Sequence, residues 1–161
     1  MIPETLGNFW QHWVVFANMP DPVPLEDILE FFNGLDHRDQ CIGLPGDSRM
    51  AFDAGRIPAI EAVRRQIHCR PDQKAVARLY YNPGDDGYSY GEHVDHYPAY
   101  YWQMTGHTRW TSGSREWTMN PGDWLYVPMG VDHTVRPLGA RVSVRFELVP
   151  FDPMDPYKEY R

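Results

Sequence analysis

The chain has 161 residues, of which 42% are hydrophobic and 14% aromatic, and its formal net charge is −7. We therefore expect a single globular domain with a proper core, too small to hold a second large domain. The acidic balance and the lack of any run of Lys or Arg argue against nucleic-acid binding. No apolar stretch is long enough to span a membrane. Cys41 and Cys69, without a signal-peptide pattern, indicate reduced thiols and a cytoplasmic protein.

Two amphipathic helices are expected in the first part of the chain. Residues 24–32 carry apolar side chains at the spacing of one helix face, and Gly34 is suited to end that helix. Residues 58–68 show the same period and begin with a proline. Residues 7–17 predict an outer strand, and residues 36–53 predict a loop with a short strand near 50–52.

Short strands separated by turn residues are expected beyond residue 71. They cover residues 74–81, 88–95, 99–105, 107–112, 115–119, 123–127, 133–136 and 141–149. This order predicts a mainly β fold, a double-stranded β-helix or jelly roll, with the two N-terminal helices packed on its outer face. Within one domain of residues 1–161, we expect N-terminal helical and strand elements (1–72), the β-helix core (73–150) and a tail (151–161).

A histidine and a carboxylate stand two residues apart at the end of the stretch Gly87-Tyr-Ser-Tyr-Gly-Glu-His93-Val-Asp95. Residues i and i+2 of an extended strand point to the same face, so His93 and Asp95 can both reach one ion. This arrangement predicts half of a metal site. A further ligand is expected from a distant histidine that the fold brings close.

His133 is the best candidate for that ligand, because it follows a Pro128-x-Gly130 turn and opens the next predicted strand. Two imidazoles and one carboxylate form a facial ligand set that suits Fe(II) and leaves neighbouring coordination positions open. Zn(II) competes for the same ligands. The alternative interpretation is that His93, Asp95 and His133 are ordinary polar residues at strand ends.

Both halves of this pattern resemble the motifs of the cupin superfamily. The chain has Gly87-x5-His93-x-Asp95 and Gly122-x5-Pro128-x-Gly130-x2-His133, where cupins have Gly-x5-His-x-His and Gly-x5-Pro-x-Gly-x2-His. The resemblance covers residues 75–149, about half of the chain. Asp95 replaces the second histidine, the usual glutamate shortly after it is missing, and Pro137 stands where an asparagine is expected.

The first two departures are similar to the JmjC-type cupins, the Fe(II)- and 2-oxoglutarate-dependent oxygenases. The stretches Gln103-Met-Thr-Gly106-His-Thr-Arg-Trp110 and Pro121-Gly-Asp-Trp-Leu-Tyr-Val-Pro128 also resemble that branch. The resemblance implies that His93, Asp95 and His133 bind iron and that 2-oxoglutarate chelates the metal. It implies a hydroxylase, a dioxygenase that acts on a small molecule, an amino acid or a peptide side chain.

The partner of the distal 2-oxoglutarate carboxylate is the open question. JmjC-type enzymes usually have Lys or Arg where this chain has Thr108. The last strand offers a substitute, because Arg141, Ser143 and Arg145 alternate onto one face, and Arg141-x-Ser143 is similar to an Arg-x-Ser pair of other 2-oxoglutarate oxygenases. Tyr80 and Tyr90 are further candidates for hydroxyls that reach the co-substrate.

Other interpretations of these residues stay open. The arginine face of the last strand also fits a solvated outer surface, although an inward position leaves an apolar face for the helices to cover. Thr108 and Arg109 also fit a surface strand pair. The alternative functions are a metal-dependent cupin enzyme, dioxygenase or isomerase, without 2-oxoglutarate, and a non-catalytic metabolite-binding cupin. A homodimer through outer strands is possible by analogy.

Overall fold

The computed structural model describes residues 19–84 and 90–151. The helices are α1 (Leu25–Asn33) and α2 (Pro58–Arg64). The strands are β1 (Cys41–Leu44), β2 (Ser48–Ala51), β3 (Gln73–Asn82), β4 (Ala99–Thr105), β5 (Thr108–Ser112), β6 (Arg115–Met119), β7 (Trp124–Val127), β8 (Thr134–Pro137) and β9 (Arg141–Pro150).

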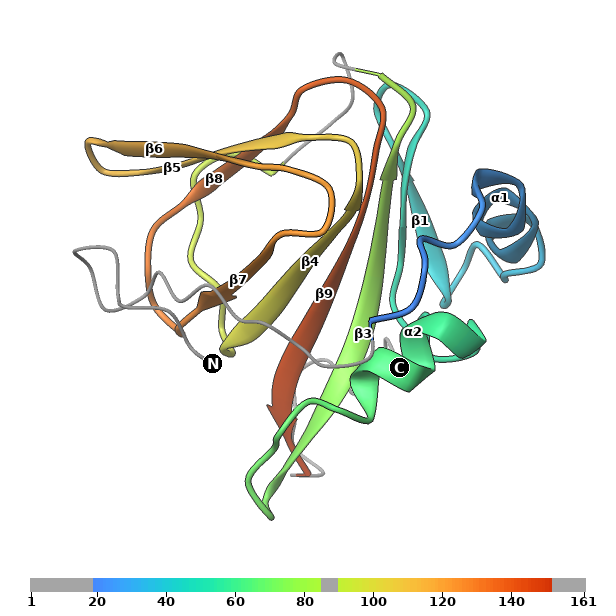
Figure 1. The fold of residues 1–161 in the computed structure, drawn as a ribbon, viewed down its shortest axis with the longest axis horizontal. Coiled ribbons are helices and arrows are strands. Elements are labelled where there is room, and N and C mark those ends of the chain that lie inside the picture. Colours follow the sequence, from blue (N-terminus) through green and yellow to red (C-terminus); the bar gives the residue numbers. More distant parts are fainter. Residues whose placement is uncertain (1–18, 85–89, 152–161) are drawn as a thin grey trace.

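These strands form two antiparallel sheets. The larger sheet has the order β1-β2-β3-β9-β4-β7, and the smaller one has the order β6-β5-β8. In Figure 1 the smaller sheet lies opposite the half of the large sheet that contains β4 and β7, while both helices lie on the other side of the large sheet. The structure therefore confirms a double-stranded β-helix with two helices packed on its outer face.

Strand β9 runs through the middle of the large sheet and separates two environments. Val142, Val144 and Phe146 point to the helices and share one apolar core with residues of both helices, including Ile28 of α1 and Ile60 of α2. The intervening side chains, which include the arginines, point into the space between the two sheets. The inward orientation of this polar face follows from the period of two, since the helices cover the apolar face.

The turn between β4 and β5 passes directly against the loop that precedes β9. Gly106 has a φ of +70°, and a Cβ atom added there would lie 2.0 Å from the carbonyl oxygen of Ala140. Only glycine fits this position, because both the backbone conformation and the close contact exclude a side chain. The contact fixes where β5 begins relative to β9.

The observed elements differ from the predicted ones in three places. Helix α2 ends at Arg64, because the chain continues to Ile67 in a turn whose amides bond three residues back, which still buries Ile67. Strand β1 was not predicted. It pairs with β2 across a turn in which Gly46 and Asp47 have positive φ, and a four-residue strand is too short for a clear alternation.

The strand predicted at 88–95 is wrong for its described part. Only His93 forms a β-bridge there, with His133, and the chain around it is irregular. One pair of hydrogen bonds between the two histidine backbones replaces a ladder. The predicted strand at 7–17 and residues 152–161 of the predicted tail lie outside the described residues.

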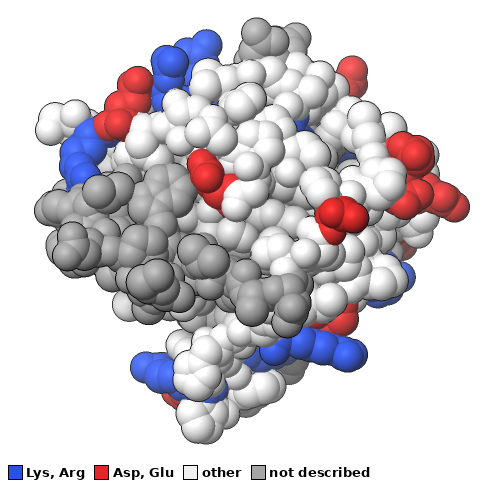
Figure 2. All heavy atoms as spheres, in the orientation of Figure 1, with Lys and Arg blue, Asp and Glu red and all other residues white. Residues whose placement is uncertain are grey.

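No helix among the described residues is long and apolar enough to cross a membrane. Figure 2 shows one face of the molecule, on which the charged side chains that are drawn lie mainly toward the edge and both signs occur. The absence of a nucleic-acid partner stays a prediction.

Candidate metal and anion site

Three potential metal ligands come together from two separate segments. His93 and Asp95 lie between β3 and β4, and His133 lies directly before β8. The backbone N–H of each histidine donates to the carbonyl of the other, at 3.0 and 2.9 Å, and the Gly130 N–H donates to the Asp95 carbonyl at 3.2 Å. These bonds hold the two segments side by side, so the predicted histidine pair forms without a regular strand.

The ligand atoms of the three side chains face one another. The distance from His93 Nε2 to Asp95 Oδ1 is 3.6 Å, and the distance from His133 Nε2 to Asp95 Oδ2 is also 3.6 Å. One ligand atom from each residue lies within 4.8 Å of the others. These separations are too long for hydrogen bonds but suit atoms that share an ion.

The other ring nitrogen of each histidine is already engaged. His93 Nδ1 lies 2.7 Å from the Gly91 carbonyl oxygen, and His133 Nδ1 lies 2.9 Å from the Val131 carbonyl oxygen. A carbonyl only accepts, so Nδ1 carries the proton and Nε2 presents a lone pair toward Asp95. This is the tautomer that a metal site requires.

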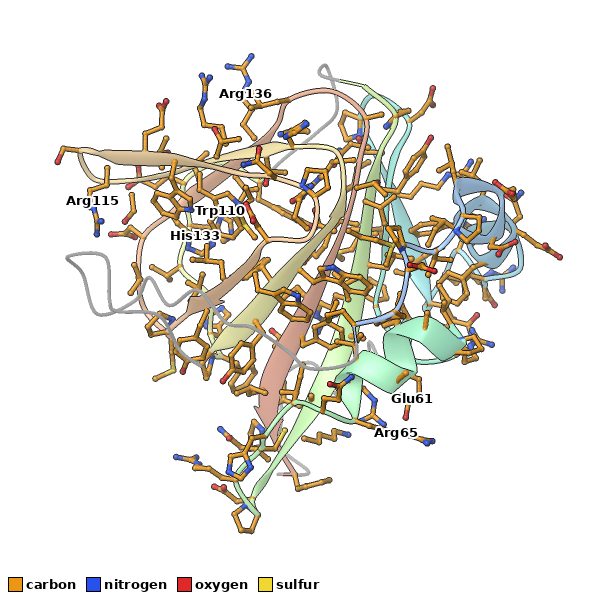
Figure 3. The ribbon with its side chains drawn as sticks, viewed as in Figure 1. Glu61, Arg65, Trp110, Arg115, His133 and Arg136 are labelled. Carbon is orange, nitrogen blue, oxygen red and sulfur yellow. The ribbon has the colours of Figure 1, made fainter. Side chains whose placement is uncertain are left out.

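His133 is suited to a metal rather than to solvent. Its side chain is fully buried, and its Nε2 is a buried atom without a hydrogen-bond partner among the described residues. Burial lowers its pKa, which favours the neutral, metal-binding form. The indole of Trp110 stacks on the imidazole with ring centroids 5.3 Å apart, and Figure 3 shows both rings inside the barrel. The residues present therefore fit a divalent metal ion.

Both carboxylate oxygens of Asp95 have additional partners. The Tyr101 hydroxyl donates to Oδ2 at 2.8 Å, and Arg145 Nη2 lies 3.3 Å from Oδ1. Burial raises the pKa of Tyr101 well above its ordinary value, so the phenol keeps the proton that it donates. These contacts fix the orientation of the carboxylate between the two imidazoles.

Arg145 belongs to a buried row of alternating charges. It donates to Glu147 at 3.0 Å, and Glu147 also accepts from Arg78 at 2.8 Å. Burial alone would lower the pKa of Arg145, but Tyr101, Tyr80 and the carboxylates of Glu147 and Asp95 together raise it. The charge of Arg145 is therefore already compensated by two carboxylates.

Arg141 has a different environment. Its guanidinium donates to the Asn82 side-chain oxygen and, at 3.1 Å, to the Ser143 hydroxyl, and it lies over the Tyr80 ring at 5.7 Å. Among the described residues no carboxylate lies within ion-pair distance of it. Burial lowers the pKa of Arg141 to about 10, which still leaves it protonated at neutral pH. A buried guanidinium with neutral partners is suited to an anionic ligand.

Two residues of the triad, His93 and Asp95, line one cavity of about 490 Å³ together with Arg141, while His133 is buried behind them. Arg145, Tyr101 and Tyr80 line it between these two groups, and apolar side chains of the β1–β2 hairpin line another part of its wall, among them Leu44 and Met50. A ligand in this cavity can contact both a metal and the guanidinium of Arg141, which has no carboxylate partner among the described residues.

The remaining predicted site residues have different positions. Tyr90 lies exposed at the cavity, with its hydroxyl directed to Met50 Sδ at 3.8 Å. Ser143 lies behind Arg141 and does not line the cavity. The surface interpretation of Thr108 is wrong, because alternation points Thr108 inward, where it is fully buried, and points Arg109 outward to an exposed ion pair with Glu116.

Five buried polar residues around the site were not identified from the sequence. They are Arg78 and Asn82 of β3, Tyr101 and Gln103 of β4, and Glu147 of β9. The ladders place Arg78 opposite Arg145 and Gln103 opposite Ser143, on the inward face. A signal was present, since polar residues also alternate along β3, but it requires the strand register that only the fold provides.

Comparison with known proteins supports the fold. No protein-family model and no curated protein sequence matches the chain. The ribosomal oxygenase YcfD of Escherichia coli, in complex with cobalt and succinic acid, matches with a TM-score of 0.70 and 18% identity over 92% of this chain and 51% of YcfD. Its complex with cobalt and 2-oxoglutarate matches with a TM-score of 0.67 and 16% identity over 86% of this chain and 47% of YcfD.

The chain therefore spans about half of the length of the YcfD chains that it matches. At this identity the likeness concerns the fold, and it confirms the cupin and JmjC-like architecture expected from the sequence. The chain combines a fold similar to that of YcfD with a His–Asp–His cluster that is consistent with Fe(II) binding.

Proposed function

We propose that the protein is an Fe(II)- and 2-oxoglutarate-dependent oxygenase that hydroxylates a small molecule, an amino acid or a peptide side chain. The observation that carries this proposal is that two residues of a three-ligand metal cluster, His93 and Asp95, line the same cavity as a buried arginine whose described partners are neutral. A 2-oxo acid with a distal carboxylate has the two functional groups that these features would bind.

Each part of the site has a role in this proposal. His93, Asp95 and His133 would bind the metal at three neighbouring coordination positions. Arg141 would bind the distal carboxylate of 2-oxoglutarate, and Arg145 would orient Asp95. Bound Fe(II) would supply the redox chemistry in which dioxygen, the oxidant, oxidises 2-oxoglutarate and hydroxylates the substrate. YcfD, which has a similar fold, has been crystallised with cobalt and 2-oxoglutarate, and this supports the assignment.

The size and lining of the cavity support a small substrate. A volume of about 490 Å³ is at the low end of the range for ligand pockets and must hold the co-substrate as well. The apolar side chains of Leu44, Met50 and Phe52 offer contacts to a carbon skeleton. An amino acid, a small metabolite or one side chain of a peptide would fit.

An anaerobic titration of the Fe(II)-loaded protein with 2-oxoglutarate tests the proposal. We expect a weak visible charge-transfer absorption band at stoichiometric iron, and its loss in the Asp95→Ala variant. Iron binding without such a band would contradict the use of 2-oxoglutarate. It would favour the second candidate, a metal cupin enzyme that acts on its substrate directly, which is consistent with the uncharged Thr108 on β5.

A further inference from the structure

A chain of hydrogen bonds crosses the inner face of the large sheet and has Arg141 at its centre. On one side the Asn82 amide group donates to the Ser48 hydroxyl at 2.6 Å, while its oxygen accepts from Arg141. On the other side Ser143 accepts from Arg141 and donates to Gln103 Oε1 at 3.0 Å. Each acceptor of the guanidinium is therefore held by a further neutral group.

The directions of the hydrogen bonds around Gln103 are fixed. Gln103 Oε1 also accepts from the Thr108 hydroxyl at 2.9 Å, which itself accepts from the Trp110 indole at 3.1 Å. Gln103 Nε2 donates to the Thr105 carbonyl at 2.9 Å. The amide of Gln103 can therefore not flip without losing these bonds, and the proton of Ser143 must point away from Arg141.

All side chains of this hydrogen-bonded network are buried, and Arg141 is the charged one among them. The others are Ser48, Asn82, Ser143, Gln103, Thr108 and Trp110. This combination orients a guanidinium without neutralising it. A carboxylate in the place of Asn82 would also hold Arg141, but it would compete with an anionic ligand.

We propose that Ser48 and Gln103 are positioning residues. Ser48 holds Asn82 and Gln103 holds Ser143, so that the N–H groups of Arg141 that do not bond to Asn82 or Ser143 face an anion in the cavity. The inference rests on the proposed function, in which that anion is the distal carboxylate of 2-oxoglutarate. Neither residue lines the cavity, and both act through a neighbour, Ser48 through Asn82 and Gln103 through Ser143. Their effect is confined to the selection of a second carboxylate.

The test compares 2-oxoglutarate with 2-oxopentanoate, which has the same carbon chain but a methyl group in place of the distal carboxylate. Dissociation constants of both acids for the Fe(II)-loaded, oxygen-free protein are measured by calorimetry. The ratio of the two constants reports the contribution of the distal carboxylate, which the proposed function assigns to Arg141. A purely structural role of the network would change stability, or both constants together, without changing that ratio.

We expect Gln103→Met to reduce the preference for 2-oxoglutarate about tenfold and Ser48→Ala to reduce it about threefold. The affinity for 2-oxopentanoate and for Fe(II) should stay unchanged. Gln66→Met in the exposed turn that follows α2 and Ser114→Ala in the exposed β5–β6 turn are matched controls that should keep the wild-type ratio. Ser48→Ala removes a single atom, so it tests the proposal even if Gln103→Met does not fold.

The possible failures can be told apart. A wild-type ratio retained in both variants would overturn the positioning role and leave the proposed function intact. A wild-type protein that binds both acids equally would overturn the assignment of Arg141 to the distal carboxylate, and the positioning role with it. Binding of neither acid to the iron-loaded protein would contradict the proposed function itself.

Discussion

Burying a guanidinium without a carboxylate partner costs free energy, and Arg141 is buried in this way. The lowering of its pKa from 12.5 to about 10 corresponds to a destabilisation of about 3 kcal/mol at neutral pH. Arg141→Met removes this cost but leaves Asn82 and Ser143 without a donor, so the free energy of unfolding of the ligand-free protein should rise by only about 1 to 2 kcal/mol. Urea denaturation measures this change.

The sign of the pH dependence follows from the same shift. The destabilisation is present at every pH below the folded pKa of about 10 and disappears only as the pH rises beyond it. The gain in Arg141→Met should thus be the same between pH 6 and pH 9, while 2-oxoglutarate binding is lost. A variant that loses both stability and co-substrate binding would show that Arg141 has a structural role instead.

His133 gives the metal-free protein a second dependence on pH, which has the same sign as that of Arg141 but lies below neutral pH. Burial lowers its pKa in the folded state, so below the ordinary histidine pKa of about 6.5 the unfolded chain takes up a proton that the folded chain does not. Stability should fall as the pH decreases from 7 to 5, by up to about 1.4 kcal/mol per pH unit from this group. The slope should be shallower in His133→Gln, measured by urea denaturation in the presence of a chelator.

Strand β9 shows how one element serves both the core and the site. Its apolar face packs under the helices, and its polar face supplies Arg141, Arg145 and Glu147 to the interior of the barrel. Glu147 is fully buried between Arg78 and Arg145. These two arginines lie on β3 and β9, so the carboxylate joins the central pair of strands through side chains as well as through the ladder.

Glu147→Gln should reduce the free energy of unfolding by about 3 kcal/mol, because it leaves two buried guanidinium groups without their shared carboxylate. Glu116→Gln is the matched control, since its ion pair with Arg109 between β5 and β6 is exposed, and it should change stability by less than about 0.5 kcal/mol. Thermal or urea unfolding compares the two. Equal effects of both substitutions would contradict a buried ionic contribution.

The sequence predicted elements well where one face of the segment is buried. The alternation on β9 and the helical period of α1 each reflect such a face, and both elements were found within about one residue of their predicted ends. The segment at 90–95 was predicted less well because its backbone forms a single β-bridge and one further hydrogen bond to the partner segment, not a ladder. Its ligand spacing still indicated the metal cluster, since two residues at i and i+2 can converge without a ladder.

What the sequence alone could not provide is the register between strands. Gln103 lies opposite Ser143, and Arg78 lies opposite Arg145, only because β4 and β3 pair with β9 in one particular alignment. The sequence alone also could not show that Arg141 and Arg145 of the same strand have different roles. These roles depend on their partners, such as Asn82 for Arg141 and Asp95 for Arg145, which come from distant parts of the chain.

At the scale of the whole molecule, the metal ligands join two segments that β4 to β7 separate in the sequence. The core between the helices and the large sheet does not involve these ligands. The metal-free protein should therefore stay folded and unfold cooperatively in a chelator, unlike domains whose folding depends on a metal. Fe(II) at a concentration about 100 times its dissociation constant should add about 2.7 kcal/mol to the free energy of unfolding.

His93→Ala tests this increment without disturbing the core, because the His93 side chain is partly exposed. The variant should unfold like the metal-free wild type and should not respond to Fe(II). His107→Ala removes a histidine that bonds to Asn120 outside the cluster, so it should keep the full increment. Since only the folded state brings the ligands together, a metal that stabilised all three proteins equally would have to bind elsewhere, and that result would remove the basis for the proposed chemistry.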